Sequence, residues 1–256
     1  CGLAQVSRPF TALEQSEVQP LFHAEAGIRL VATARLDNRA ALCERLAIPV
    51  AEANTLSDAA LILRAYLCWG EDCAACLLGD FAFVVWDGAR RRLFCARDQR
   101  GEVPLFWYYD ERRRLAVATA AGALLSLPGV DANLNLQMLA DRLSTNAGYD
   151  CTQTFFSSIR MLPAGHCLLA SDQGVRVRAY WQWEPERRIH FARDDEYVEA
   201  FREIFFQAVE SRMSGFRPVG AQLSGGLDSS SVVAVAARRL AQDACARCHG
   251  PNGVSA

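Results

Sequence analysis

The sequence predicts a layered α/β protein, and three observations support this fold class. Apolar runs of strand length alternate with helical patterns between residues 28 and 119, and several of the runs end at turns. A further apolar run at 219–223 is followed by two glycines and then by a helical pattern. The chain has 256 residues, 51% of them hydrophobic and 22% charged, which is an ordinary globular composition for one large domain or two modest ones.

The composition argues against several classes of protein. The formal net charge is −2, so no long-range attraction to nucleic acid or to a membrane surface is expected. No apolar run approaches the roughly 20 residues of a membrane span, and the start of the sequence lacks the charged and apolar regions of a signal peptide. Ten scattered cysteines without such a signal indicate a reducing, cytoplasmic environment rather than a disulfide framework.

The elements of the first half follow from the apolar runs and the turns between them. Residues 28–36 are predicted to form a strand, and Asp37-Asn38-Arg39 leads into a helix with an apolar stripe at Leu42, Leu46 and Ile48. Ser57-Asp58 is predicted to cap a second helix over 59–69. Four more strands are predicted, at 77–87, 91–97, 105–109 and 115–119. The first two of them form a hairpin with its turn at Asp87-Gly88.

The second half begins where the chain turns polar, between Trp183 and Asp195. We place a domain junction there, which predicts domains over 1–185 and 190–256. Asp194 or Asp195 is expected to cap a helix with apolar residues at helical spacing, namely Tyr197, Val198, Phe201, Ile204, Phe205 and Val209. A strand over 219–223, a glycine turn and an apolar helix reaching Arg238 and Arg239 complete the predicted elements.

The segment from Leu223 to Ser230 has the features of an anion-binding loop. A strand, a glycine turn and a helix point backbone N–H groups and a helix N-terminus at a bound anion, and Gly225 and Gly226 let a phosphate approach the backbone. Ser224, Ser229 and Ser230 can add hydroxyl donors, while Asp228 can cap the helix or orient a hydrated metal ion. The lysine of a GxxxxGK[ST] loop is missing, and all 27 basic residues are arginine.

Cys1 is a second candidate site residue, because an N-terminal cysteine carries a nucleophile and a base together. Its α-amine titrates near pH ~8 and can accept the thiol proton.

These motifs occur together in one known family. The string LSGGLDSS resembles the pyrophosphate loop of the asparagine synthetases, which are ATP pyrophosphatases. The order of Cys1-Gly2, GDFAF at 79–83, ARD at 96–98, LPAGH at 162–166 and this loop is similar to that of the whole family. The resemblance implies a four-layer αββα N-terminal nucleophile fold for about the first 180 residues, and then the start of a Rossmann-like ATP pyrophosphatase domain.

The same resemblance implies an activity and a set of site residues. The family joins a carboxylate such as aspartate to an amine by adenylation with ATP and Mg²⁺, with glutamine as the nominal nitrogen donor. Cys1 would attack glutamine, and Asp58, expected to lie near Cys1, would contact the glutamine amine. The nucleotide would be held by Leu223, Ser224, Gly225, Gly226, Asp228, Ser229 and Ser230.

The chain departs from the family pattern where glutamine would bind. Thr33, Ala34 and Arg35 stand where the family has Asn, Gly and Glu, which supply an oxyanion-hole donor and substrate contacts. Such a degraded pocket resembles that of the β-lactam synthetases and the lasso-peptide cyclases. In these enzymes the substrate, which is a peptide in the cyclases, already carries the amine. We therefore expect little or no glutaminase activity, and we keep a non-catalytic fragment as a further alternative.

The remaining cysteines suggest packing more than chemistry. Cys73-Ala-Ala-Cys76 has metal or redox spacing but lies among apolar residues without a nearby histidine, and buried small residues are expected there. Cys43, Cys68, Cys95, Cys151 and Cys167 are predicted to be buried for the same reason.

One more cysteine motif lies near the end of the sequence. Cys245-x-x-Cys248-His249 fits a c-type haem attachment motif, but only seven residues follow it, too few to supply a distal ligand. We therefore disfavour haem and predict no metal site; a truncated or fused tail after about residue 243 is the expected explanation.

Overall fold

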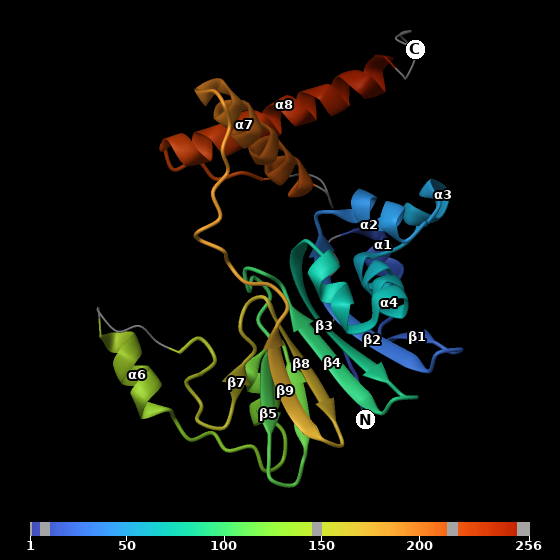
Figure 1. The fold of residues 1–256 in the computed structure, drawn as a ribbon, viewed down its shortest axis with the longest axis vertical. Coiled ribbons are helices and arrows are strands. Elements are labelled where there is room, and N and C mark those ends of the chain that lie inside the picture. Colours follow the sequence, from blue (N-terminus) through green and yellow to red (C-terminus); the bar gives the residue numbers. More distant parts are fainter. Residues whose placement is uncertain (1, 6–10, 145–149, 214–219, 250–256) are drawn as a thin grey trace. The chain divides into compact units, whose positions relative to one another are not determined.

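The computed structural model describes residues 2–5, 11–144, 150–213 and 220–249 (Figure 1). The chain divides into two compact units, one running mainly from Ser16 to Trp183 and the other mainly from Glu184 onward. Within the described residues, no helix is both long and apolar enough to cross a membrane. Each unit has its own architecture.

The first unit is built on a six-stranded antiparallel sheet in the order β1-β2-β3-β4-β8-β9. Its central pair, β2 and β3, runs in register from Ile28 opposite Asp87 to Leu36 opposite Gly79. Alternate residues at the start of β2 are buried, as the sequence pattern predicts for a strand with one face on the core. The strands span Leu21–His23 (β1), Ile28–Leu36 (β2), Gly79–Asp87 (β3), Arg92–Arg97 (β4), His166–Ser171 (β8) and Gly174–Ala179 (β9).

Helices cover one face of this sheet (Figure 1). The longest of them is α4 (Asp58–Trp69), which packs against β2 and buries Leu61, Ile62 and Tyr66. The ring of Tyr66 stacks on Phe94 of β4 with a centroid separation of 5.8 Å. The neighbouring short elements are α2 (Arg39–Arg45), α3 (Val50–Ala53) and the 3-10 helix η1 (Gly70–Cys76).

A second, three-stranded sheet covers the other face, in the order β6-β5-β7. Trp107 and Val117 from this sheet pack against Val84 and Leu168 of the first sheet, which forms a second apolar core. The strands span Phe106–Tyr109 (β5), Leu115–Ala118 (β6) and Arg160–Met161 (β7).

Helix α5 (Ala121–Leu125) completes the layers. It packs on β5 and β6, and α6 (Leu136–Leu143) follows it in the chain. Tyr108 alternates with the inward-facing Trp107, and its hydroxyl donates to the Gly129 carbonyl just after α5. The result is a helix–sheet–sheet–helix sandwich, which confirms the predicted layered α/β class.

The second unit contains two long helices that pack on each other, α7 (Asp194–Ser211) and α8 (Leu227–His249), with the short α1 (Ala12–Ser16). Arg202 of α7 and Arg238 of α8 both approach the Phe206 ring, at 5.5 and 5.7 Å from its centroid. The cap of α7 differs from the prediction: Arg193 is the N-cap residue. The Glu196 carboxylate then accepts from the backbone N–H groups of Ala192 and Arg193.

Two predicted elements differ from the structure. Residues 220–223 form no strand, because the described part of the second unit contains no other strand with which they could pair. The first helix of the first unit ends at Arg45 rather than continuing to Ile48. Ala47 has a φ of 53°, and the N–H of Ile48 donates to the Cys43 carbonyl. This turn ends the helix.

Candidate functional site

The two predicted sites lie in different units, and the structure describes them to different extents. Cys1 lies outside the described residues, and so its distance from Asp58 stays a prediction. Asp58 is fully described: it is the first residue of α4 and is 6% exposed. Ser57 caps the helix, because its hydroxyl accepts from the Ala60 N–H at 3.0 Å and donates to the Glu17 carboxylate.

Both carboxylate oxygens of Asp58 are engaged by the chain itself. Oδ2 accepts from the backbone N–H of Leu36 at 2.8 Å, and Oδ1 forms an ion pair with Nη1 of Arg39. The other terminal nitrogen of Arg39 donates to the carbonyls of Ala53, at 3.1 Å, and Leu56, at 2.7 Å. A carboxylate that was predicted to face a substrate amine thus holds β2, α2 and α4 together.

Arg35, which is predicted to stand where the family has a glutamate, is also paired within the chain. It lies opposite Asp80 in the β2–β3 register, and its Nη2 lies 3.3 Å from Asp80 Oδ2 and 3.0 Å from Asp37 Oδ1. The three charged side chains are largely shielded from solvent. Arg35 therefore contributes a cation to an internal cluster at the end of β2.

The ARD motif has a structural role that the sequence pattern did not reveal. Arg97 is 7% exposed and donates to the carbonyls of Gly101 and Leu162 at 2.6 Å and of Val103 at 2.9 Å. The neighbouring Asp98 is fully buried and accepts from the N–H groups of the loop that follows it. Burial lowers the pKa of the Arg97 guanidinium, and the Asp98 charge opposes that shift. These residues fix the loop between β4 and β5.

The predicted pyrophosphate loop is brought together at the start of α8. The hydroxyl of Ser229 accepts from the Ser224 N–H at 3.2 Å and lies 2.9 Å from the Ser224 hydroxyl. Ser230 donates its hydroxyl to the Gly226 carbonyl at 2.8 Å. Gly225 has a φ of +82°, which favours glycine, and an added Cβ there would meet no atom within 4 Å.

The rest of this loop is open to solvent. Leu223 and Asp228 are exposed, as are both glycines, and Asp228 lies in the first turn of α8. Open space, a glycine turn and a helix N-terminus fit the phosphates of ATP. Magnesium bound with a nucleotide needs one or two protein carboxylates, which Asp228 fits. Within the described residues, no three His, Cys, Asp or Glu side chains are grouped to hold a metal ion alone.

The other motifs are placed as follows. Cys73 is fully buried in the core under α4, while the Sγ of the half-buried Cys76 accepts from Arg45 at 3.3 Å. The side chains of Cys245, Cys248 and His249 lie outside those that the structure describes.

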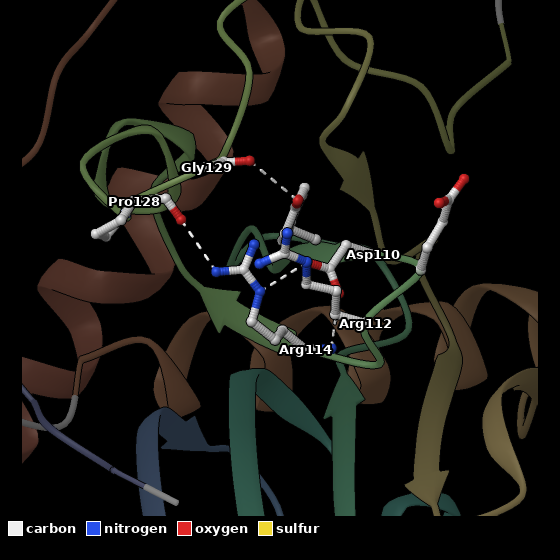
Figure 2. A pocket seen from close by; sticks show the side chains of 7 residues that line it. Asp110, Arg112, Arg114, Pro128 and Gly129 are labelled. Atoms are coloured by element: carbon white, nitrogen blue, oxygen red, sulfur yellow. Dashed lines mark hydrogen bonds and ion pairs between the residues drawn. The ribbon is translucent and has the colours of Figure 1, made fainter.

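A surface hollow of about 540 Å³ lies at the β5–β6 turn, and none of the predicted site residues lines it (Figure 2). Figure 2 shows Arg114 reaching Asp110, at 2.7 Å, and the Pro128 carbonyl, at 3.2 Å. Hydrogen bonds from Arg114, above all from its backbone N–H and then from its side chain, lower the pKa of the Asp110 carboxyl. The polar groups of the hollow therefore stabilise a hairpin turn.

Comparison with known proteins gives matches in both units. The family model "Glutamine amidotransferase domain" matches residues 2–181, and "Asparagine synthase" matches residues 200–249. "Asparagine synthetase [glutamine-hydrolyzing] 3" of Bacillus subtilis is 33% identical over 193 residues, which cover 75% of this chain and 31% of that protein. "Amidase chry2" of Gibberella zeae is 30% identical and covers 94% of this chain and 35% of its own length.

Among solved structures, the glutamine phosphoribosylpyrophosphate amidotransferase of B. subtilis matches with a TM-score of 0.41 and 17% identity, over 64% of this chain and 32% of that one. The chain thus spans about a third of the length of the curated relatives that it matches. The amidotransferase match alone covers well over half of the chain. The chain therefore belongs to the glutamine amidotransferase domain family, and its residues 200–249 are similar to asparagine synthase.

Proposed function

We propose that the chain provides the amidotransferase-like domain and the pyrophosphate loop of an ATP-dependent amide-forming ligase. In this reaction a carboxylate oxygen attacks the α-phosphorus of ATP, and pyrophosphate leaves. An amine then attacks the acyl carbon, AMP leaves, and the nitrogen loses a proton as the amide forms. The observation that carries the proposal is the ordered loop Ser224-Gly225-Gly226 at the N-terminus of α8.

The loop is suited to hold the leaving pyrophosphate. The first N–H groups of α8 lack partners within the helix, and the helix dipole favours negative charge there. The link between Ser224 and Ser229 fixes the backbone N–H and hydroxyl groups before a ligand arrives, so little ordering is needed on binding. Magnesium, when bound with the nucleotide, would offset the negative charge of the phosphates. The loop itself cannot offset this charge, because it offers only neutral donors and the Asp228 carboxylate.

The loop function can be tested by calorimetric titration with magnesium pyrophosphate and with MgATP. We expect weak, saturable binding that is lost in the Ser224→Ala, Asp228→Ala double variant. Binding that is absent, or that the double variant leaves unchanged, would contradict the proposal.

Turnover is a separate expectation. Adenylation needs positioned cations in the transition state, and the 256 residues contain no lysine. We therefore expect no loop-dependent pyrophosphate release from MgATP and aspartate by these residues alone. Release that is lost in the double variant would show that arginines and magnesium suffice.

A specific observation favours an amine that does not come from glutamine. Arg35 replaces the family's glutamate and is paired with Asp37 and Asp80, while Thr33 and Ala34 replace the oxyanion donor and its neighbour. Loss of one oxyanion donor alone lowers turnover by about 10²–10³-fold. We therefore propose a ligase like the β-lactam synthetases or lasso-peptide cyclases, in which the substrate itself carries the amine.

The measurement for this second proposal is ammonia release from glutamine by the chain and by its Cys1→Ala variant. We expect no difference between the two proteins. Ammonia release that disappears in the variant would mean that glutamine is still the donor.

A further inference from the structure

The geometry points to a new role for Arg39: we propose that its guanidinium is a built-in cation that occupies Asp58 and closes this carboxylate to external amines. Asp58 would then be an anchor of the fold rather than a substrate contact. The inference deepens the proposal that glutamine is not the nitrogen donor, but it concerns binding and stability instead of turnover. The two can therefore fail separately.

Both oxygens of the Asp58 carboxylate have partners within the chain. Asp58 is almost completely buried, and its two oxygens receive the Leu36 N–H and the Arg39 guanidinium. A buried carboxylate is stable when paired and hydrogen-bonded in this way, and strongly unfavourable when one partner is removed. An incoming ammonium would have to share or displace the guanidinium.

Displacement of the Arg39 guanidinium would leave other groups of the chain unsatisfied. Nη2 of Arg39 donates to the carbonyls of Ala53 and Leu56, in the segment that leads from α3 to α4. The planar fork of the guanidinium serves the carboxylate and both carbonyls from one fixed position, which a lysine or a free ammonium could not reproduce. Removing the guanidinium would take away its hydrogen bonds to three acceptors, namely Asp58 Oδ1 and the carbonyls of Ala53 and Leu56.

Arg35 pairs with the neighbouring carboxylates in a similar way. Arg35 lies one residue before Leu36 on β2, and its own pairs with Asp37 and Asp80 use the nearby carboxylates. The carboxylates of Asp37, Asp58 and Asp80 therefore each face an arginine of the same chain. The site has the chemistry of a guanidinium receptor that is already filled.

If the Arg39 side chain is removed, the site it leaves should accept a small guanidinium ion. In Arg39→Ala, the Asp58 carboxylate and the two carbonyls would remain, with space where the side chain was. We expect the melting temperature of this variant to fall by about 10 °C. Methylguanidinium chloride at 10 mM should restore part of that loss compared with 10 mM sodium chloride.

Two control proteins make the rescue specific. Arg64→Ala removes an exposed arginine whose ion pair with Glu52 has a length of 2.8 Å, and it should show neither the large loss nor the rescue. The wild-type chain should not be stabilised by methylguanidinium. An unchanged melting temperature in Arg39→Ala, or equal effects of the two salts on it, would overturn the proposal.

A second measurement uses the folded wild-type chain, in case Arg39→Ala does not fold. Ligand-observed NMR with L-glutamine and with propylamine should detect no binding that depends on Asp58. Binding to the wild type that is absent in Asp58→Asn would show that the carboxylate is open to amines, and the proposal would be wrong.

Discussion

At residue 79 the chain carries a glycine because the backbone of the neighbouring strand leaves no space for a side chain. An added Cβ would lie 2.0 Å from the Arg35 carbonyl oxygen, and the φ of +144° is one that other residues rarely adopt. We expect Gly79→Ala to destabilise the protein by about 3 kcal/mol or more, measured by urea unfolding.

Gly122 provides the matched control for this substitution. It lies in α5, and its added Cβ would meet no atom within 4 Å. Gly122→Ala should be neutral, or stabilising by up to about 1 kcal/mol. Equal effects at the two positions would show that the contact between Gly79 and Arg35 is not what requires glycine.

The thiols should differ widely in reactivity. Burial raises the pKa of Cys73 and Cys95 far above the usual range, so at pH 8 both are neutral thiols and poor nucleophiles. Cys68 and Cys151 are exposed. Among the cysteines whose surroundings the structure describes, brief maleimide labelling of the native protein, read by peptide mass spectrometry, should modify these two first. Early modification of Cys73 or Cys95 would contradict the described core.

The exposure of Cys68 and Cys151 corrects the prediction that both are buried, while Cys43, Cys95 and Cys167 are buried as predicted. Cys68 follows Arg64 by four residues on α4, and so both lie on the same outward stripe. The helical period, applied residue by residue, would have placed Cys68 outside. Arg39 is a harder case, since its partner Asp58 is 19 residues away and no local pattern joins the two.

Among the elements, α4 depends on its cap as well as on its apolar stripe. Ser57 is 5% exposed and satisfies the Ala60 N–H at the start of the helix. Ser57→Ala should lower the free energy of unfolding by about 1 kcal/mol. The control is Ser126→Ala, at the exposed end of α5, with an expected change within about 0.5 kcal/mol. A Ser57→Ala change no larger than that of the control would argue against the cap.

The strands of the first unit could be predicted well from sequence, because their pattern and their pairing agree. Residues 28–36 form a strand with the predicted bounds, and the hairpin partner predicted from Arg91 begins one residue later. The run at 219–223 has the same local pattern, but residues 220–223 have no strand to pair with in the described part of their unit. A local pattern gives the tendency, and long-range pairing decides the outcome.

The candidate sites divide in the same way. The predicted pyrophosphate loop is local in sequence, and the structure brings its serines together. The environment of Asp58 depends on Leu36 and Arg39, which lie on other elements. The sequence could therefore identify Asp58 as a candidate, but it could not predict that Leu36 and Arg39 of the same chain bind its carboxylate.

At the scale of the whole molecule, the two units are stabilised very differently. The first has two apolar cores, on either side of the six-stranded sheet. In the second, α7 leaves apolar side chains largely exposed, with Val198 at 63%, Phe201 at 70% and Ile204 at 64%. Burial of apolar surface is the main favourable term in folding, so the second unit should open more readily than the first.

This difference predicts where trypsin cleaves first. Residues 184–192 form neither helix nor strand and are exposed throughout, and they include Arg187 and Arg188. The arginine-containing turns at 90–92 and 112–114 are also exposed, but hydrogen bonds within their hairpins stabilise them. The Arg90 N–H donates to the Asp87 carboxylate, and the Arg114 N–H donates to the Asp110 carboxylate. A protease needs a locally opened segment, which these turns provide only when their sheets open.

Limited trypsin digestion, followed by intact-mass analysis, should therefore yield first a fragment that ends at Arg187 or Arg188, and this fragment should resist further cleavage. The Arg187→Gln, Arg188→Gln double variant should lose this early cut without a change in melting temperature, since neither side chain forms an ion pair in the described structure. An early cut at 90–92 or 112–114 would mean instead that the first unit opens as readily as the segment that follows it.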